Sequence, residues 1–452
     1  MTVIHAATAL LPDGWASDVR VELAEGRIAR VTPGAEPQGQ RVDCLLPAPV
    51  NLHSHAFQRA MAGLTERRGP GNDSFWTWRE LMYRFLGQLT PEDVGAIAAM
   101  VMMEMAEAGY AALAEFHYLH HGPGGARYDD PAEMSARIAA AAAQTGLGLT
   151  LLPVLYERGG CDGRALNEGQ KRFGNTPEGY AKLWEGAGRA LRDLPGDSVL
   201  GVAPHSLRAA SAFGIRLATG LCPTSPVHIH VAEQVAEVAE VQAATGLRPV
   251  EWLLRHVELG PRWCLIHATQ MEPFETEGMA RSGAVAGLCP ITESNLGDGI
   301  FDGMRYRAAG GAFGVGSDSN VRIALAEELR VLEYSQRLAG KGRAMLATQD
   351  RSTGRVLLEE AARGGAVAGG RQAGAIAPGL WADLTALDLS GPDMAGRQGD
   401  AILDTWIFAG DDRLVAEVWS AGRHLVTGGR HVARDGIIAA YRATMARLAE
   451  AL

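Results

Sequence analysis

Two histidines, His53 and His55, stand two residues apart in the segment NLHSHAF, at the end of an apolar run. Strand geometry would point both imidazoles to the same face. His230 in HIHVAEQ and Asp318 in GVGSDSN also follow apolar runs directly. Three imidazoles and one carboxylate form a donor set that suits zinc, with Fe(II) as the alternative ion. We therefore predict that this set holds one divalent metal ion. The predicted ligands are His53, His55, His230 and Asp318.

His228 lies two residues before His230 and is the alternative ligand on that run. We favour His230 because the earlier residue lies deeper in the strand and further from its end. A site with two metals bridged by a carboxylated lysine is excluded, because none of the three lysines ends a middle apolar run. These lysines are Lys171, Lys182 and Lys341.

Two further residues could move protons beside such a metal. Glu233 follows His230 by three residues, where its carboxylate could take a proton from water and pass it to a leaving nitrogen. His267 ends the strongly apolar run CLIH, where an unpaired imidazole is costly to bury. We predict that His267 polarises the attacking hydroxide or the substrate, and that Asp318 can double as a base. The alternatives are a solvated glutamate at a helix start and a core histidine.

These residues belong to a repeated pattern in which a short apolar run is followed by a helix-like segment, as in βα units. Eight such runs occur between residues 45 and 320, a span close to the roughly 250 residues of a (β/α)8 barrel. The candidate polar residues gather at the carboxyl ends of the runs, where barrel enzymes place their active sites. We predict a TIM-like α/β barrel over residues 49–375, with an open doubly wound sheet as the alternative.

The two ends of the chain lack this alternation of apolar runs and helix-like segments. Residues 1–48 contain short β-like pieces separated by Gly, Asp and Pro turn signals. Similar pieces return in residues 376–452, after an Ala/Gly-rich helical stretch near 352–373. We predict that the two ends pair into one small discontinuous β-sandwich domain with a helix at the C-terminus.

Composition limits the partners. The formal net charge of -10 argues against a nucleic-acid or acidic-membrane binder. The five scattered cysteines include no CxxC pair, which fits reduced thiols in a cytosolic protein. We find no signal-peptide pattern and no apolar run of the roughly 18 residues that a membrane span needs. We expect a soluble cytoplasmic protein with a small-molecule partner.

The strings PVNLHSHAF, HIHVAEQ, LIHAT and GVGSDSN resemble the amidohydrolase superfamily, in particular its mononuclear deaminase-like branch. Within it, NLHSHAFQRAMAGLTE, SFWTWRE, AEFHYLHH, APHSLRA and LCPITESNLGDGIF resemble the formimidoylglutamate deiminases of histidine degradation. The resemblance implies hydrolysis of N-formimidoyl-L-glutamate to N-formyl-L-glutamate and ammonia, with zinc as the usual metal. It places the ligands and the acid–base pair at the residues named above.

The resemblance also implies five substrate contacts: Gln58, Arg79, Tyr118, His205 and Arg208. A dicarboxylate suits guanidinium groups, so Arg79 and Arg208 are expected to bind the carboxylates. In this Arg-rich chain, the sequence alone would place either arginine at the surface. A homodimer is a family-based expectation.

One departure from the family pattern is Gln270, which stands where a second histidine usually follows LIHAT. We expect it to affect the positioning of groups around the site and not the chemistry itself. The rival hypotheses are another mononuclear amidohydrolase that deaminates a cyclic amidine or nucleobase, and a non-catalytic metal-binding protein.

Overall fold

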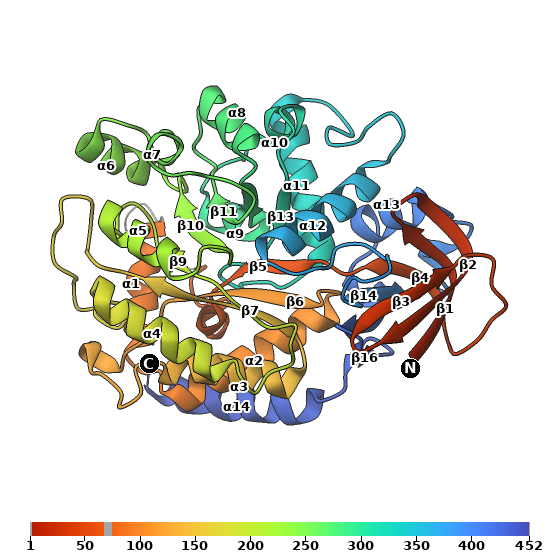
Figure 1. Ribbon diagram of the computed structural model, residues 1–452, viewed down its shortest axis with the longest axis horizontal. Coiled ribbons are helices and arrows are strands. Elements are labelled where there is room, and N and C mark those ends of the chain that lie inside the picture. The colour runs from red at the N-terminus through yellow and green to blue at the C-terminus, as the bar shows by residue number, and fades with distance from the viewer. Residues whose placement is uncertain (1, 67–74, 452) are drawn as a thin grey trace.

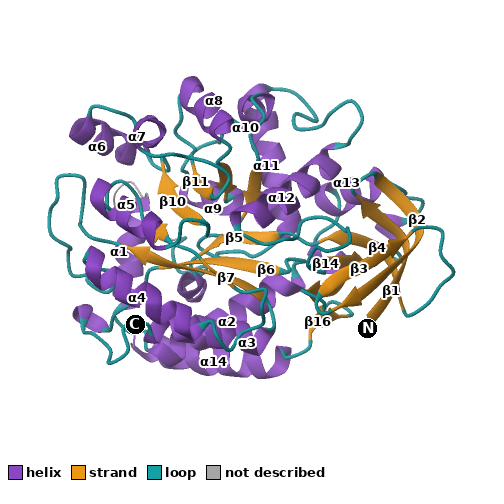
Figure 2. Ribbon diagram, in the orientation of Figure 1, coloured by secondary structure: helices purple, strands orange, loops and turns teal. Residues whose placement is uncertain are grey.

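The computed structural model describes residues 2–66 and 75–451. Residues 67–74, which the predicted barrel segment includes, lie outside the described part, as do residues 1 and 452. Two units are visible in Figure 1, a strand barrel surrounded by helices and a sheet built from both ends of the chain. Figure 2 shows the strands of the barrel at its centre and the helices around them.

The barrel consists of parallel strands in chain order. They are β5 (Val50–Ser54), β6 (Ala112–His117), β7 (Gly148–Leu155), β8 (Val199–Leu200), β9 (Ala203–Pro204), β10 (Val227–Val231), β11 (Trp263–His267), β12 (Val285–Leu288) and β13 (Phe313–Val315). Two parallel sheets carry these strands, and bridges at Val202–Val227 and Ser54–Asp318 join the sheets at both edges. The ring is therefore closed. The predicted barrel is confirmed, and the open sheet is excluded.

The fourth barrel position is split into β8 and β9, although the sequence predicted one strand there. β8 pairs with the first half of β7, and β9 pairs with its last two residues. Pro153 lies between these two pairings and has no N–H to donate. The carbonyl of Gly201 accepts a hydrogen bond from the Trp184 indole instead, at 3.0 Å. The proline thus explains the interruption.

Helices follow the strands and cover the barrel. They are α1 (Phe75–Leu86), α2 (Pro91–Glu107), α3 (Glu133–Thr145), α4 (Pro177–Ala190), α5 (Ala212–Leu221), α6 (Val235–Thr245), α7 (Pro249–His256), α8 (Pro273–Ser282), α9 (Pro290–Leu296), α10 (Gly303–Ala308), α11 (Leu325–Gly340) and α12 (Thr353–Ala368). Several begin with proline, which fits the first turn because that turn needs no N–H. In α12, a Cβ on Gly364 would lie 1.9 Å from the Phe313 carbonyl oxygen. Glycine therefore lets α12 pack closely on β13.

The two ends of the chain form one eight-stranded sheet in the order β17-β16-β15-β14-β4-β1-β2-β3. Its strands are β1 (Thr2–Leu11), β2 (Gly14–Ala24), β3 (Arg27–Thr32), β4 (Gln40–Pro47), β14 (Leu384–Leu387), β15 (Val415–Ser420), β16 (Arg423–Thr427) and β17 (Arg430–His431). β4 and β14 pair antiparallel, so the predicted pairing of the two ends is confirmed. The red and blue strands lie together at the right of Figure 1.

Two helices complete the C-terminal segment. α13 (Asp400–Phe408) contacts α11 and α12, and α14 (Arg434–Ala451) returns to pack on α2. Ion pairs join Arg434 to Glu107 and Arg447 to Asp93 at the two ends of that contact. Within the described ranges, no helix has both the length and the apolar character needed to cross a membrane.

A buried ion-pair network connects the terminal sheet to the barrel. The Arg371 guanidinium lies 3.0 Å from Asp383 and 3.1 Å from Asp197, and all three side chains are almost fully buried. Arg423 of β16 donates to the same Asp197 at 2.7 Å. Removing one partner from such a network leaves a buried charge uncompensated.

We expect Arg371→Met to lower the free energy of unfolding by about 3–5 kcal/mol, because two buried carboxylates would lose their central partner. The denaturant midpoint measures this effect. Arg413→Met removes an arginine that is exposed beside Asp411 and is the matched control, which should keep the wild-type midpoint. Equal midpoints for wild type and the Arg371 variant would contradict the expectation.

Candidate metal centre and active site

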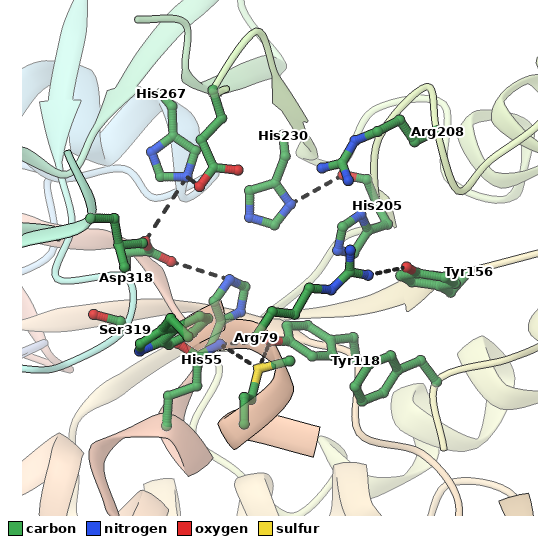
Figure 3. A pocket seen from close by; sticks show the side chains of 16 residues that line it. His55, Arg79, Tyr118, Tyr156, His205, Arg208, His230, His267, Asp318 and Ser319 are labelled. Carbon is green, nitrogen blue, oxygen red and sulfur yellow. Dashed lines mark hydrogen bonds and ion pairs between the residues drawn. The ribbon is translucent and has the colours of Figure 1, made fainter. Parts of the chain in front are cut away.

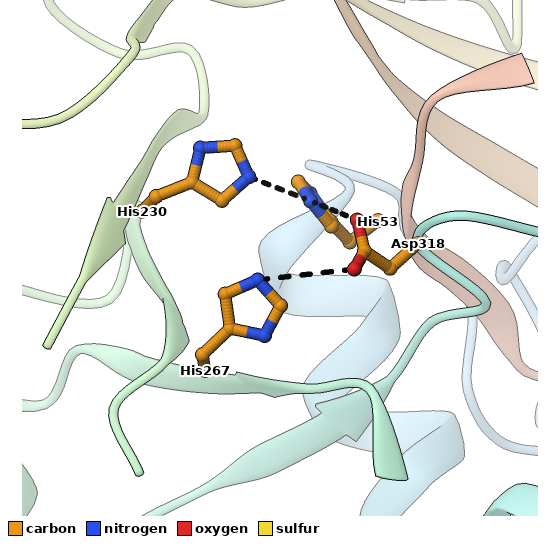
Figure 4. A group of neighbouring side chains, drawn as sticks. All are labelled: His53, His230, His267 and Asp318. Carbon is orange, nitrogen blue, oxygen red and sulfur yellow. Dashed lines mark hydrogen bonds and ion pairs between the residues drawn. The ribbon is translucent and has the colours of Figure 1, made fainter. Parts of the chain in front are cut away.

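Four predicted donors meet at the carboxyl ends of β5, β10 and β13. Nε2 of His53 lies 3.3 Å from Oδ1 of Asp318, and Nε2 of His55 lies 3.2 Å from the same oxygen. Nε2 of His230 lies 3.0 Å from Nε2 of His53. Figure 4 shows His53, His230 and Asp318 converging with a fourth side chain, His267. The structure therefore brings together every residue that the sequence assigned to the metal.

The cluster of possible metal ligands also includes His267, to which the sequence analysis gave a catalytic role and not a ligand role. One ligand atom from each of His53, His230, His267 and Asp318 lies within 4.8 Å of all the others. His55 is outside that tightest group, although it contacts Asp318 directly. Five side chains thus surround one point, and their protonation decides which of them can bind a cation.

Backbone carbonyls orient two of the imidazoles. Nδ1 of His55 lies 3.0 Å from the Phe116 carbonyl oxygen, and Nδ1 of His230 lies 3.1 Å from the His205 carbonyl oxygen. A carbonyl accepts only, so Nδ1 carries the proton and Nε2 presents its lone pair to the centre. His228, the alternative ligand, instead contacts the Ala368 carbonyl oxygen at 2.8 Å and lies outside the group.

The backbone at the centre is held in unusual conformations. His267 and Asp318 have φ values of +70° and +46°, and Ala232, which precedes Glu233, has +50°. Such values are uncommon for residues other than glycine, and they concentrate at functional sites. A Cβ on Gly316 would lie 2.6 Å from the His53 backbone nitrogen, so glycine lets the strand of Asp318 approach β5. These features aim the ligands and could not be deduced from the sequence.

Burial controls the charges of the donors. It lowers the pKa of His53 to about 3, and burial together with His53 lowers the pKa of His230 well below its usual range. Both rings are therefore neutral and have lone pairs to give. Burial would raise the pKa of Asp318, but its contacts with His53 and His55 and the nearby His267 outweigh burial and lower that pKa well below its usual range, so the carboxylate is ionised.

Glu233 and His267 lie next to the donors. Nε2 of His267 is 3.9 Å from Oε1 of Glu233 and 4.0 Å from Oδ2 of Asp318. Burial raises the pKa of Glu233. Burial opposes the charged form of His267, but Glu233, Glu293 and Asp318 together raise its pKa to about 10. Perturbed groups of this kind are typical of catalytic acids and bases.

A pocket opens from this centre toward the predicted substrate contacts. Its lining includes all five of them: Gln58, Arg79, Tyr118, His205 and Arg208. Gln58 donates to the Tyr118 hydroxyl at 2.6 Å, and Arg79 donates to the Tyr156 hydroxyl at 2.9 Å. Figure 3 shows Arg208, His205 and Tyr156 on the side of the pocket away from His267 and Asp318. The structure therefore places these residues around one cavity.

The two arginines make that side of the pocket positive. Burial is the largest cause that lowers the pKa of His205, and the charges of Arg208 and Arg79 are the next largest. Both charges therefore lie near this ring. Arg208 is buried, and Arg79 is partly buried. Buried guanidinium groups suit carboxylate ligands, because their planar N–H groups match two oxygens at once.

Gln270 lies outside the lining of the pocket and contacts the loop that follows α9. Its side chain donates to the backbone carbonyl of Asp298, and Gln234 donates to the carboxylate of the same residue. Gln270 and Gln234 thus help to hold this loop against the ends of β11 and β10. Whether that contact affects the reaction stays a prediction.

Sequence reasoning missed several groups of the site. Tyr156 directly follows β7 and contacts Arg79, and Glu293 in the first turn of α9 contacts His267. Trp78, Met82, Phe173, Leu296 and Ser319 complete the pocket lining. Tyr156 follows an apolar run directly, a signal that could have been used. The other six lie in loops or helices, where sequence periodicity does not indicate which way a side chain points.

Comparisons with known proteins agree with this geometry. Residues 44–425 match the model of the amidohydrolase family, and residues 1–41 match the N-terminal domain of formimidoylglutamate deiminase HutF. A solved amidohydrolase from Brucella melitensis is 50% identical, with a TM-score of 0.95 and coverage of 99% of this chain and 100% of that one. A zinc-bound adenosine deaminase from Xanthomonas campestris shares the fold, with a TM-score of 0.83, 21% identity and coverage of 99% and 98% of the two chains.

The barrel, the donor cluster and these matches show that the chain belongs to the amidohydrolase family, a family of metal-dependent hydrolases that includes C–N bond hydrolases. A formimidoylglutamate deiminase from Pseudomonas aeruginosa is 51% identical over 441 residues, which cover 96% of this chain and 97% of that protein. Within the family, the chain belongs to the formimidoylglutamate deiminases.

Proposed function

We propose that the chain hydrolyses N-formimidoyl-L-glutamate to N-formyl-L-glutamate and ammonia as a step of histidine degradation. One observation carries the proposal: a single pocket has a histidine and carboxylate cluster at one end and two guanidinium groups at the other. A linear amidine with two carboxylates has complementary groups in the same order. The identity to the Pseudomonas aeruginosa enzyme supports the same reaction.

The donor set fits one divalent cation. His53 and His230 are neutral, Asp318 is ionised, and the Nε2 atoms of His55 and His230 face the centre because their Nδ1 atoms contact carbonyls. We assign the cation to His53, His55, His230 and Asp318. His267 is a poorer ligand because its acidic surroundings favour the protonated ring, which lacks a free lone pair. Nitrogen and oxygen donors of this kind favour zinc.

When bound, the cation lowers the pKa of a water molecule and polarises the substrate. Glu233 removes a proton from the attacking water, whose oxygen forms a bond to the carbon of the protonated formimino group while the C=N bond becomes single and its nitrogen becomes NH2. His267 donates from Nε2 to the attacking oxygen and stabilises the charge that develops there. Asp318, with its second oxygen toward His267, can accept a proton from the same oxygen.

The second half of the reaction uses the same carboxyl group. Glu233 returns its proton to the NH2 group formed from the protonated formimino nitrogen, the bond between this nitrogen and carbon breaks, and ammonia leaves while the hydroxyl proton passes to Asp318. The carbon–oxygen bond becomes the carbonyl of the formyl group. The pKa of Glu233 is raised by burial, which suits a group that must both accept and release a proton near neutral pH.

The far end of the pocket orients the substrate. We assign the two carboxylates to Arg79 and Arg208, with Tyr118, Gln58 and His205 as hydrogen-bonding neighbours. The two positive charges also disfavour a neutral ring, which would bring no negative charge to offset the desolvation of the guanidinium groups.

The decisive assay compares metal-reconstituted and metal-free protein on N-formimidoyl-L-glutamate. We expect ammonia and formylglutamate only with the metal-loaded protein. A panel of cyclic amidines and nucleobases tests the rival deaminase activity, and turnover of a ring substrate without turnover of the linear one would refute the proposal. Absence of ammonia from every substrate would favour a non-catalytic metal-binding protein.

We expect Arg208→Met to raise KM for N-formimidoyl-L-glutamate about 10- to 100-fold, which corresponds to losing one charged hydrogen bond. The increase in KM should be much smaller with a formimidoyl substrate that lacks the carboxylate assigned to Arg208, because Arg208 then has no carboxylate to bind even in the wild type. Steady-state kinetics on both substrates measures the difference. Arg216→Met, at an exposed position on α5, is the control and should match wild type. An equal KM increase on both substrates would contradict a role in binding one of the two carboxylates.

A further inference from the structure

The carboxylate of Glu293 lies directly behind His267, on the side away from the pocket centre. Oε1 of Glu293 is 3.3 Å from Nδ1 of His267 and accepts from the backbone N–H of Cys289 at 2.9 Å. Both residues are buried. Neither the sequence pattern nor the catalytic scheme above uses this contact.

The protein holds Glu293 in place from several directions. Helix α9 begins directly after Cys289, and Glu328 of α11 accepts from the N–H of Ile291 in its first turn at 2.9 Å. The N–H of Asp298 donates to the backbone carbonyl of Glu293 at 2.9 Å. The carboxylate therefore has a fixed place relative to β11, and the ring of His267 meets a rigid acceptor.

This contact determines which nitrogen of His267 faces the reaction. A carboxylate accepts hydrogen bonds and repels a lone pair, so the proton stays on Nδ1. Nε2 is then the atom that faces Glu233 at 3.9 Å and Asp318 at 4.0 Å. A rotation of the ring would break the contact between Nδ1 and Glu293 and move Nε2 away from Glu233 and Asp318.

The same three side chains, His267, Cys289 and Glu293, are spaced closely enough to hold an ion of their own. However, burial raises the pKa of the Cys289 thiol well above its usual range, so the sulfur keeps its proton. Oε1 of Glu293 already has a backbone donor and a ring donor. These contacts indicate a hydrogen-bonded support and not a second metal site.

We infer that Glu293 is a positioning residue that holds Nδ1 of His267 and thereby fixes the ring orientation with Nε2 toward the reacting groups. The inference rests on the proposed deimination, in which Nε2 of His267 acts on the attacking oxygen. Glu293 touches neither the substrate nor the metal in this scheme and acts only through the imidazole.

Two kinds of substitution separate this role from a purely structural one. Glu293→Met removes the acceptor, whereas Glu293→Gln keeps an amide oxygen that can accept from both Nδ1 and the Cys289 N–H. We expect the methionine variant to lower kcat about 10- to 100-fold, the usual cost of losing a partner that orients a site histidine. KM and bound metal per chain should stay at wild-type values. The glutamine variant should recover most of kcat. If the methionine variant does not fold, Glu293→Ser, whose hydroxyl is too short to contact the ring, replaces it.

Glu328→Gln is the matched control, because Glu328 is a buried carboxyl group of α11 that contacts the Ile291 N–H and not His267, and glutamine can still accept from that N–H. It should keep the wild-type kcat. Loss of kcat in this control equal to that in Glu293→Met would overturn the inference in favour of a general effect on α9. Unchanged kcat per metal-loaded chain in the methionine or serine variant would also overturn it. If wild type itself does not turn over the substrate, the proposed function fails before the variants are compared.

Discussion

Glu233→Gln is expected to lower kcat about 10²- to 10⁴-fold, the usual contribution of general acid–base catalysis. The amide has nearly the shape of the carboxyl group but can neither take the proton of water nor deliver it to the leaving nitrogen. Steady-state kinetics and metal analysis of the same sample measure the effect. Bound metal should stay at the wild-type level, because Glu233 is not among the assigned ligands.

The control for this variant lies on the adjacent helix. Glu240→Gln on α6 changes a glutamate that contacts Arg164 and the Cys161 N–H and does not line the pocket. It should keep wild-type turnover. A Glu233→Gln enzyme with wild-type kcat would refute the proton-transfer role, and loss of metal in that variant would instead make Glu233 a ligand.

Asp318→Asn is expected to abolish both metal binding and turnover. It removes the only negative charge among the assigned ligands, and metal activation is worth several kcal/mol, which corresponds to about a 10³-fold or greater loss of rate. Asparagine tolerates the φ of +46° at this position, so the backbone contacts of residue 318 with His53 and His55 should persist. Metal content after dialysis and kcat at saturating metal measure the two effects.

Asp302→Asn is the matched control, because Asp302 caps the exposed start of α10 and contacts Arg305. It should bind metal like wild type. If the Asp318 variant bound a full equivalent of metal with unchanged kcat, the four-ligand assignment would be wrong.

The fold was largely predictable because its signals are local. Eight apolar runs with polar ends gave the barrel, and each run contains a strand or strand pair. The pairing of the two chain ends, through β4 and β14, was expected because both ends contain short β-like segments separated by turn residues. The break between β8 and β9 was not predicted, because it depends on a proline in the neighbouring strand. Such an effect appears only when two segments are aligned in a sheet.

The residues of the candidate site likewise fall into those that the sequence could predict and those that it could not. His53 and His55 could be placed on one face because a strand alternates with a period of two, and the structure brings both to Asp318. Arg79 and Arg208 were indistinguishable from surface arginines until the family resemblance was considered. Glu293 follows an apolar run, but its contact with His267 could not be predicted, since it arises only when α9 turns back onto β11. Contacts between loops and helices therefore set the limit of sequence-based prediction here.

The most direct test of the proposed reaction is product analysis of N-formimidoyl-L-glutamate turnover in ¹⁸O-labelled water. The mechanism predicts one ammonia per N-formyl-L-glutamate, with one ¹⁸O atom in the formyl group, and only with metal-loaded protein. Formation of glutamate and formamide would show that the other C–N bond breaks. That result, or equal turnover by metal-free protein, would contradict the account.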